Sequence, residues 1–127
     1  MKKPYTVLLV DDDQFLLGMY QKKFEKMGAK PEMCAGSTFA LNKLREGTKF
    51  DIIVLDIIMP GMDGIELLRK LREEKLAENS VVVMLTNESA STRIEEAKAL
   101  GIAGYIVKAT SVPSEVVEGI IKIADSL

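Results

Sequence analysis

Histidine and tryptophan are absent from this chain of 127 residues, and cysteine occurs once, as Cys34. Without histidine the chain has no Ser-His nucleophile, no histidine-ligated metal and no phosphohistidine of its own. A single cysteine excludes an internal disulfide and fits a reducing compartment, and a lone thiol is usually a packed side chain without chemistry. Sites built on imidazole or on paired thiolates are therefore excluded.

Strong net charge and long apolar stretches are missing as well. The 17 basic and 19 acidic residues give a net charge of −2, so no bulk attraction to nucleic acid or to anionic membranes is expected. Every apolar run is far shorter than the roughly 20 residues that span a bilayer, and the first run stops at Asp11, unlike a signal peptide. We expect a cytoplasmic protein with one domain over residues 1–127.

Short, nearly continuous apolar runs predict strands that are buried on both faces, as in parallel sheets. These runs are residues 5–10 (YTVLLV), 50–55 (FDIIVL), 80–85 (SVVVML) and 104–107 (GYIV). A weaker run at 30–35 (KPEMCA) contains proline and polar residues, which predicts a strand at the edge of the sheet.

Helical patterns follow each of these runs. Asp13 and Ser37 are the expected N-caps of the first two helices. The alternation of strands and helices predicts an α/β protein, with a doubly wound sheet of five parallel strands and helices on both faces. The apolar stripes that predict the helices are Leu16, Leu17, Tyr20, Phe24 and Met27; Phe39, Ala40 and Leu44; Ile65, Leu67, Leu68, Leu71 and Leu76; Ile94, Ala97 and Leu100; and Val116, Val117, Ile120, Ile121 and Ala124.

Polar side chains come directly after the predicted strands. In an open α/β sheet, ligands bind beyond the carboxyl ends of the strands, so these side chains should meet at one rim. Polar residues at a strand end are common singly, but the whole set predicts a site. Its members are Asp11, Asp12 and Asp13 after the first strand, Asp56 after the third, Thr86 and Asn87 after the fourth, and Lys108 after the fifth.

These residue types suit phosphoryl chemistry. Carboxylates without histidine or cysteine make a hard oxygen site, which favours Mg²⁺ over Zn²⁺. Asp56 can serve as a nucleophile, because carboxylates form acyl phosphates. The charge on a transferring phosphoryl group needs a metal, a hydrogen-bond donor and a cation, for which Asp11 with Asp12, Thr86 and Lys108 are the candidates. The motifs GxxxxGK[ST] and GxGxxG are absent, so nucleotide binding is not expected.

Four motifs give residues 4–127 a close resemblance to the receiver domain of bacterial two-component response regulators. The motifs are LLVDDD (8–13), VLDIIMPGMDG (54–64), MLTN (84–87) and GYIVK (104–108). The resemblance, which is to chemotaxis-regulator-like receivers, implies a flavodoxin-like (βα)5 fold with strand order 2-1-3-4-5. It also implies a phosphorylation-activated signalling switch rather than an enzyme acting on a separate substrate.

The resemblance implies a role for each residue of the rim. Asp56 would accept a phosphoryl group from a phosphohistidine on a sensor histidine kinase or a histidine phosphotransfer protein. Asp12 would bind Mg²⁺ directly and Asp11 largely through water, with Asp56 and the backbone carbonyl of Ile58 as further ligands. Lys108 would pair with the phosphoryl oxygens.

The resemblance also implies a switch that reports phosphorylation. Thr86 would hydrogen-bond the phosphoryl oxygens, and Tyr105 would change rotamer with it. The change would alter binding of a downstream effector protein or output domain. The face made by the fourth helix, the fifth strand and the fifth helix would bind a partner or a second copy, although its apolar residues Ile123 and Leu127 also fit an ordinary core.

Two alternatives remain open. A phosphatase of the haloacid dehalogenase type would use Asp11 as its nucleophile, which leaves Asp56 without a role. A pseudo-receiver would only bind partners, and would be expected to have lost part of the acid pair, the acceptor or the lysine, all of which are present.

One position departs from the family, because Ala109 follows Lys108 where a proline, often after a cis peptide bond, is usual. A cis bond before alanine costs about 2.5–4 kcal/mol.

Overall fold

A five-stranded parallel sheet is the centre of the molecule. The computed structural model describes residues 1–87, 91–108 and 111–127. The strands are β1 (Thr6–Asp11), β2 (Lys30–Ala35), β3 (Ile52–Asp56), β4 (Val81–Thr86) and β5 (Gly104–Val107). They lie in the order β2-β1-β3-β4-β5, and every neighbouring pair is parallel. The α/β fold and the strand order 2-1-3-4-5 that we predicted are confirmed.

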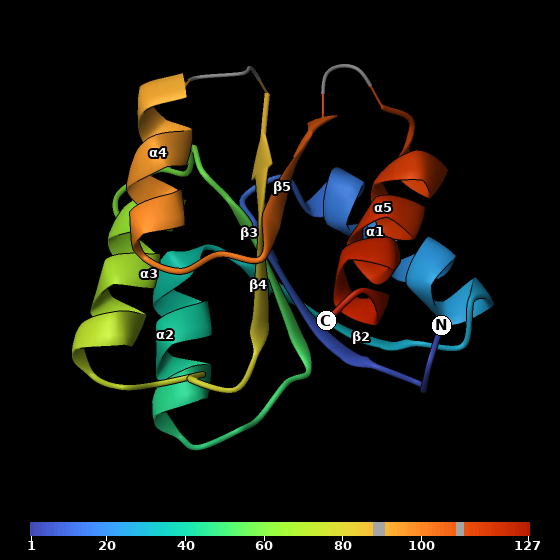
Figure 1. Ribbon diagram of the computed structural model, residues 1–127, viewed down its shortest axis with the longest axis horizontal. Coiled ribbons are helices and arrows are strands. Elements are labelled where there is room, and N and C mark those ends of the chain that lie inside the picture. Colours follow the sequence, from blue (N-terminus) through green and yellow to red (C-terminus); the bar gives the residue numbers. More distant parts are fainter. Residues whose placement is uncertain (88–90, 109–110) are drawn as a thin grey trace.

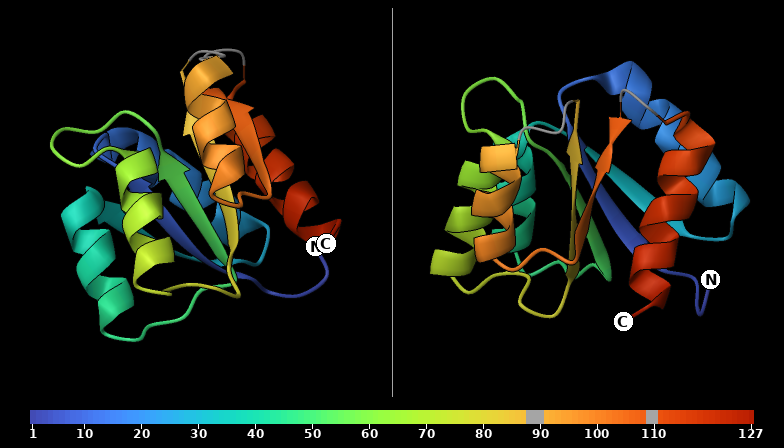
Figure 2. Two further views of the ribbon diagram at one scale, coloured as in Figure 1. Left: turned by 60° about the vertical axis from the view of Figure 1, so that its left-hand side comes forward. Right: turned by 45° about the horizontal axis from the view of Figure 1, so that its top comes forward.

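Helices cover both faces of the sheet. They are α1 (Gln14–Lys26), α2 (Ser37–Arg45), α3 (Gly64–Glu73), α4 (Ser91–Ala99) and α5 (Pro113–Asp125). Helices α2, α3 and α4 lie on one face, and α1 and α5 lie on the other (Figures 1 and 2). None of the helices in the described part of the chain is long and apolar enough to cross a membrane.

The two faces of the sheet carry separate cores, which explains why the strand sequences are apolar without alternation. Leu8 and Val10 of β1 pack with the side chains of α2, α3 and α4. Val7 and Leu9 of the same strand pack with those of α1 and α5. Successive side chains of a strand point to opposite faces, so a strand between two helical layers must be apolar at every position.

Four local expectations about the helices are wrong, the first being Met27, which is the C-cap of α1 and is 40% exposed. Gly36 is the N-cap of α2, and Ser37 is its first helical residue. Phe39 is 67% exposed, because Ala40, Leu41 and Leu44 form the buried face of α2 instead. Leu76 packs against the core from the turn after α3, which ends at Glu73.

The expected cap of α1 and the expected edge strand are confirmed. The carboxylate of Asp13 accepts a hydrogen bond from the backbone N–H of Leu16 at 3.1 Å. This bond uses one of the backbone donors left free in the first turn of a helix. The strand β2 pairs only with β1 and therefore lies at one edge of the sheet, as its proline and polar residues predicted.

Candidate functional site

Three strand ends bring two carboxylates and one ammonium group together at the carboxyl rim of the sheet. Asp11 ends β1, Asp56 ends β3, and Lys108 directly follows β5. The Nζ of Lys108 lies 3.2 Å from a carboxylate oxygen of Asp11 and 3.2 Å from one of Asp56. Asp11 and Asp56 are almost completely buried, and the side chain of Lys108 is 10% exposed. The lysine therefore compensates two buried negative charges at once.

Asp12 completes an acidic cluster that fits a divalent cation. Carboxylate oxygens of Asp11, Asp12 and Asp56 all lie within 4.8 Å of one another. Asp12 is exposed, so the cluster opens to solvent on its side. A set of ligands made only of carboxylate oxygens suits Mg²⁺. The three carboxylates predicted to hold a metal therefore lie together.

Burial and mutual repulsion control the protonation of this cluster. Burial, followed by the charge of Asp11, raises the pKa of Asp56 from 3.8 to about 7, although Lys108 opposes the shift. Burial lowers the pKa of Lys108, but the charges of Asp56 and Asp11 outweigh it and raise that pKa above its usual value. The ammonium group therefore stays charged at neutral pH. Burial, followed by the charges of Asp11 and Asp56, also raises the pKa of Tyr20 on α1 to about 12.

The raised pKa of Asp56 gives the metal-free protein a pH-dependent stability. Between about pH 4 and pH 7 the folded chain holds a proton on Asp56 that the unfolded chain has released. The free energy of unfolding should therefore fall as pH rises through this window, by at most about 1.4 kcal/mol per pH unit. Urea unfolding of the parent and of Asp56→Asn across this range isolates the effect. The difference in stability between the two should grow with pH in favour of the variant, and a constant difference would contradict the assignment.

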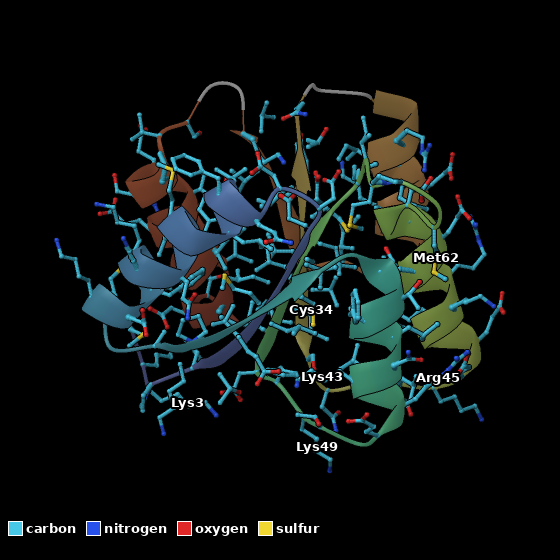
Figure 3. All side chains as sticks on the ribbon, turned by 180° about the vertical axis from the view of Figure 1, so that it is seen from behind. Lys3, Cys34, Lys43, Arg45, Lys49 and Met62 are labelled. Atoms are coloured by element: carbon cyan, nitrogen blue, oxygen red, sulfur yellow. The ribbon has the colours of Figure 1, made fainter. Side chains whose placement is uncertain are left out.

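The loop after Asp56 packs tightly against the backbone of that residue. The N–H of Gly64 donates to the carbonyl of Ile57 at 2.8 Å. A Cβ added at Gly64 would lie 2.1 Å from the backbone carbonyl oxygen of Asp56, much closer than any real Cβ contact. On the other side, the hydroxyl of Ser37 donates to the carbonyl of Met62 at 2.7 Å, where the loop lies beside the first turn of α2 (Figure 3). The position of Asp56 therefore depends on the conformation of this loop.

The remaining predicted site residues differ widely in exposure. Thr86 ends β4 and is almost completely buried. The side chain of Ile58, in the loop after β3, is 69% exposed. Tyr105 on β5 is 41% exposed, and the Nζ of Lys98 lies 5.8 Å from the centre of its ring. Ala109 and its peptide bond to Lys108 lie outside the described residues.

One charged pair beside the site was not predicted from the sequence. Asp63 caps α3 by accepting a hydrogen bond from the N–H of Glu66 at 2.8 Å. It also accepts one from the guanidinium of Arg93 on α4 at 2.6 Å. The cap is visible in the sequence, because Asp63 precedes an apolar helical pattern. The partner is not, because 30 residues separate Arg93 from Asp63.

Comparison with known proteins agrees with this geometry. Residues 7–119 match the family model of the response regulator receiver domain. The chain is 36% identical over 110 residues to chemotaxis protein CheY-3 of Vibrio cholerae, which covers 85% of this chain and 83% of that protein. It is 35% identical over 103 residues to chemotaxis protein CheY of Pseudomonas aeruginosa, and the match covers 80% of this chain and 82% of that protein. The crystal structure of Vibrio cholerae CheY4 superposes with a TM-score of 0.84 at 28% identity, covering 95% of this chain and 99% of the other. The chain therefore belongs to the family of response regulator receiver domains, which are signalling switches.

Proposed function

We propose that Asp56 is the phosphoacceptor of this receiver and that the switch is driven by phosphorylation of its carboxylate. The observation that supports the proposal most strongly is the arrangement of Asp11, Asp56 and Lys108, with one ammonium group 3.2 Å from each carboxylate. A buried acid with a strongly raised pKa is costly to the fold, and such groups are concentrated at functional sites.

The groups at the rim provide what phosphoryl transfer from a phosphohistidine to Asp56 requires. A carboxylate oxygen of Asp56 attacks phosphorus, the phosphorus–nitrogen bond of the donor phosphohistidine breaks, and the imidazole leaves with the bonding electron pair. Lys108 turns from the carboxylates toward the phosphoryl oxygens, and Thr86 donates a hydrogen bond to them. Bound Mg²⁺ would neutralise charge on the phosphoryl oxygens, and its proposed ligands are Asp11, Asp12, Asp56 and the carbonyl of Ile58.

The proposed partners follow from the same chemistry. The proposed donor is a phosphohistidine on a sensor histidine kinase or a histidine phosphotransfer protein, and the absence of histidine from this sequence agrees with a separate donor. The readout would be an effector protein or output domain that binds the face of α4, β5 and α5, where Tyr105 is the proposed switch aromatic. A second copy of the chain is an alternative occupant of that face. We propose a cytoplasmic location, where such kinases present their phosphohistidine.

Magnesium should stabilise the protein through the acidic cluster. At a concentration about 100 times its Kd, a ligand that binds only the folded state adds about 2.7 kcal/mol to the free energy of unfolding. We expect the melting temperature to rise by several degrees with Mg²⁺, and Asp12→Ala to remove this gain. Asp13→Ala is the matched control, because it removes the cap of α1 but no proposed ligand. It should lower the melting temperature yet keep the gain, and an undiminished gain in Asp12→Ala would contradict the site.

Phosphorylation by a small donor tests the function directly. Acetyl phosphate with Mg²⁺ should add one phosphoryl group per chain, as intact-protein mass spectrometry detects. Asp56→Asn should abolish the addition, and EDTA should suppress it. Steady hydrolysis of the donor that survives Asp56→Asn and is lost in Asp11→Asn would favour a phosphatase with Asp11 as nucleophile. A parent that binds neither Mg²⁺ nor a phosphoryl group would be a pseudo-receiver.

A further inference from the structure

Three arginine contacts join α3 and its N-cap to α4 and the turn that follows it. Two arginines come from α3 and one comes from α4. The contacts are the ion pair of Arg93 with Asp63 at 2.6 Å, the ion pair of Arg69 with Glu96 at 3.7 Å, and the hydrogen bonds of Arg72 to the carbonyls of Leu100 and Gly101 at 2.8 and 3.0 Å.

The contact of Arg93 with Asp63 is the one that reaches the site. Asp63 directly precedes Gly64, whose backbone packs against the carbonyl of Asp56. Arg93 is in the first turn of α4, seven residues after Thr86 in the sequence. The pair therefore joins the loop that follows the acceptor to the helix that follows the buried threonine. The other two contacts join α3 and α4 further along their length.

We propose that the Asp63–Arg93 ion pair restrains α4 in the arrangement seen here, and so limits how readily Asp56 is phosphorylated. The inference rests on the proposed function and adds a regulator to the same site. Arg93 acts as a positioning residue, because it reaches the acceptor only through Asp63 and the backbone of Gly64.

The ion pair should favour the unphosphorylated arrangement over the phosphorylated one. If Thr86 moves toward a phosphoryl group on Asp56 and the start of α4 follows it, the short contact of Arg93 with Asp63 is stretched. An interaction that is stronger in one of two states shifts the equilibrium toward that state. The carboxylate of Asp63 is 19% exposed and Arg93 is 39% exposed, so solvent screens the pair only partly. Loss of the pair should therefore favour the phosphorylated arrangement.

A double-mutant cycle with acetyl phosphate and Mg²⁺ tests the restraint. Arg93→Gln removes the charge, and Asp63→Asn removes it while keeping an oxygen that can cap α3. Each should speed phosphorylation by roughly threefold to tenfold, and the double variant should be no faster than either single one. Arg93→Lys keeps the charge and should return the rate toward that of the parent. Glu96→Gln breaks the Arg69 pair between the same two helices and should leave the rate unchanged.

Several results of this cycle would overturn the proposed restraint. Rates in the single variants that equal the parent rate or fall below it would overturn the restraint, as would effects that add fully in the double variant. An equal acceleration in Glu96→Gln would show that general loosening of α3 from α4 is enough, and would also overturn the role of Asp63. A parent that takes up no phosphoryl group would overturn the proposed function and this inference together, whereas a phosphorylated parent with unresponsive variants overturns the inference alone.

Discussion

Replacing Gly64 with alanine should destabilise the protein by about 3 kcal/mol or more and displace the acceptor. The added Cβ would meet the carbonyl oxygen of Asp56 at 2.1 Å, its carbonyl carbon at 2.9 Å and the Cα of Ile57 at 3.1 Å. All three atoms are backbone, so no change of rotamer relieves the clash. The chain must move either α3 or the end of β3. Urea unfolding should show the loss of stability, and phosphorylation by acetyl phosphate should slow at least about tenfold, the order expected when a reacting group is misplaced by about 1 Å.

Gly18 provides the matched control for this variant. It lies within α1, and a Cβ added there would meet no atom within 4 Å apart from the adjacent backbone of its own helix. Alanine in a helix interior is favoured over glycine by about 0.5–1 kcal/mol. Gly18→Ala should therefore raise stability slightly and leave phosphorylation unchanged. A Gly64→Ala protein as stable as the parent would contradict the close approach at the acceptor.

Replacing Lys108 with methionine should destabilise the metal-free protein by about 2–4 kcal/mol at pH 8. The substitution leaves the carboxylates of Asp11 and Asp56 buried without their shared cation, and one of them must take up a proton to relieve the repulsion. The loss should be smaller at pH 5, because Asp56 is already protonated there in the parent. Denaturant unfolding at the two pH values measures both effects.

Two further variants separate this effect from the loss of an ordinary lysine. Asp56→Asn combined with Lys108→Met should recover much of the stability, because one buried charge is removed together with its partner. Lys98→Met removes a lysine whose ion pair with Glu95 is exposed, and should change stability by less than about 1 kcal/mol. If the two lysine variants were equally stable at pH 8, the buried cluster would not have the charges assigned to it.

The order of elements was predictable because the three inner strands, β1, β3 and β4, lie between two layers of helices. Such strands are apolar at every position, so the runs at β1, β3 and β4 stand out in the sequence. The polar residue after each run then predicts the rim, since parallel strands end at the same edge of the sheet. Asp11, Asp56 and Lys108 meet there as this reasoning predicts.

Contacts between distant loops were not predictable in the same way. The sequence shows Gly64 in a turn but not the carbonyl of Asp56 against it, which depends on how the loop returns to β3. The Asp63–Arg93 pair joins two helices whose relative position no local pattern encodes. The hydroxyl of Ser37 suits an N-cap, but in the fold it donates to the carbonyl of Met62 while Gly36 is the cap.

Locating the phosphoryl group on the chain tests most directly whether Asp56 is the acceptor. An acyl phosphate formed with acetyl phosphate and Mg²⁺ can be reduced with borohydride, which converts the modified aspartate to homoserine, and peptide mass spectrometry then identifies the position. We expect conversion at Asp56 alone, with a dependence on Mg²⁺ and a lower yield in Lys108→Met. Conversion at Asp11, or at Asp56 with no dependence on Mg²⁺, would contradict this expectation.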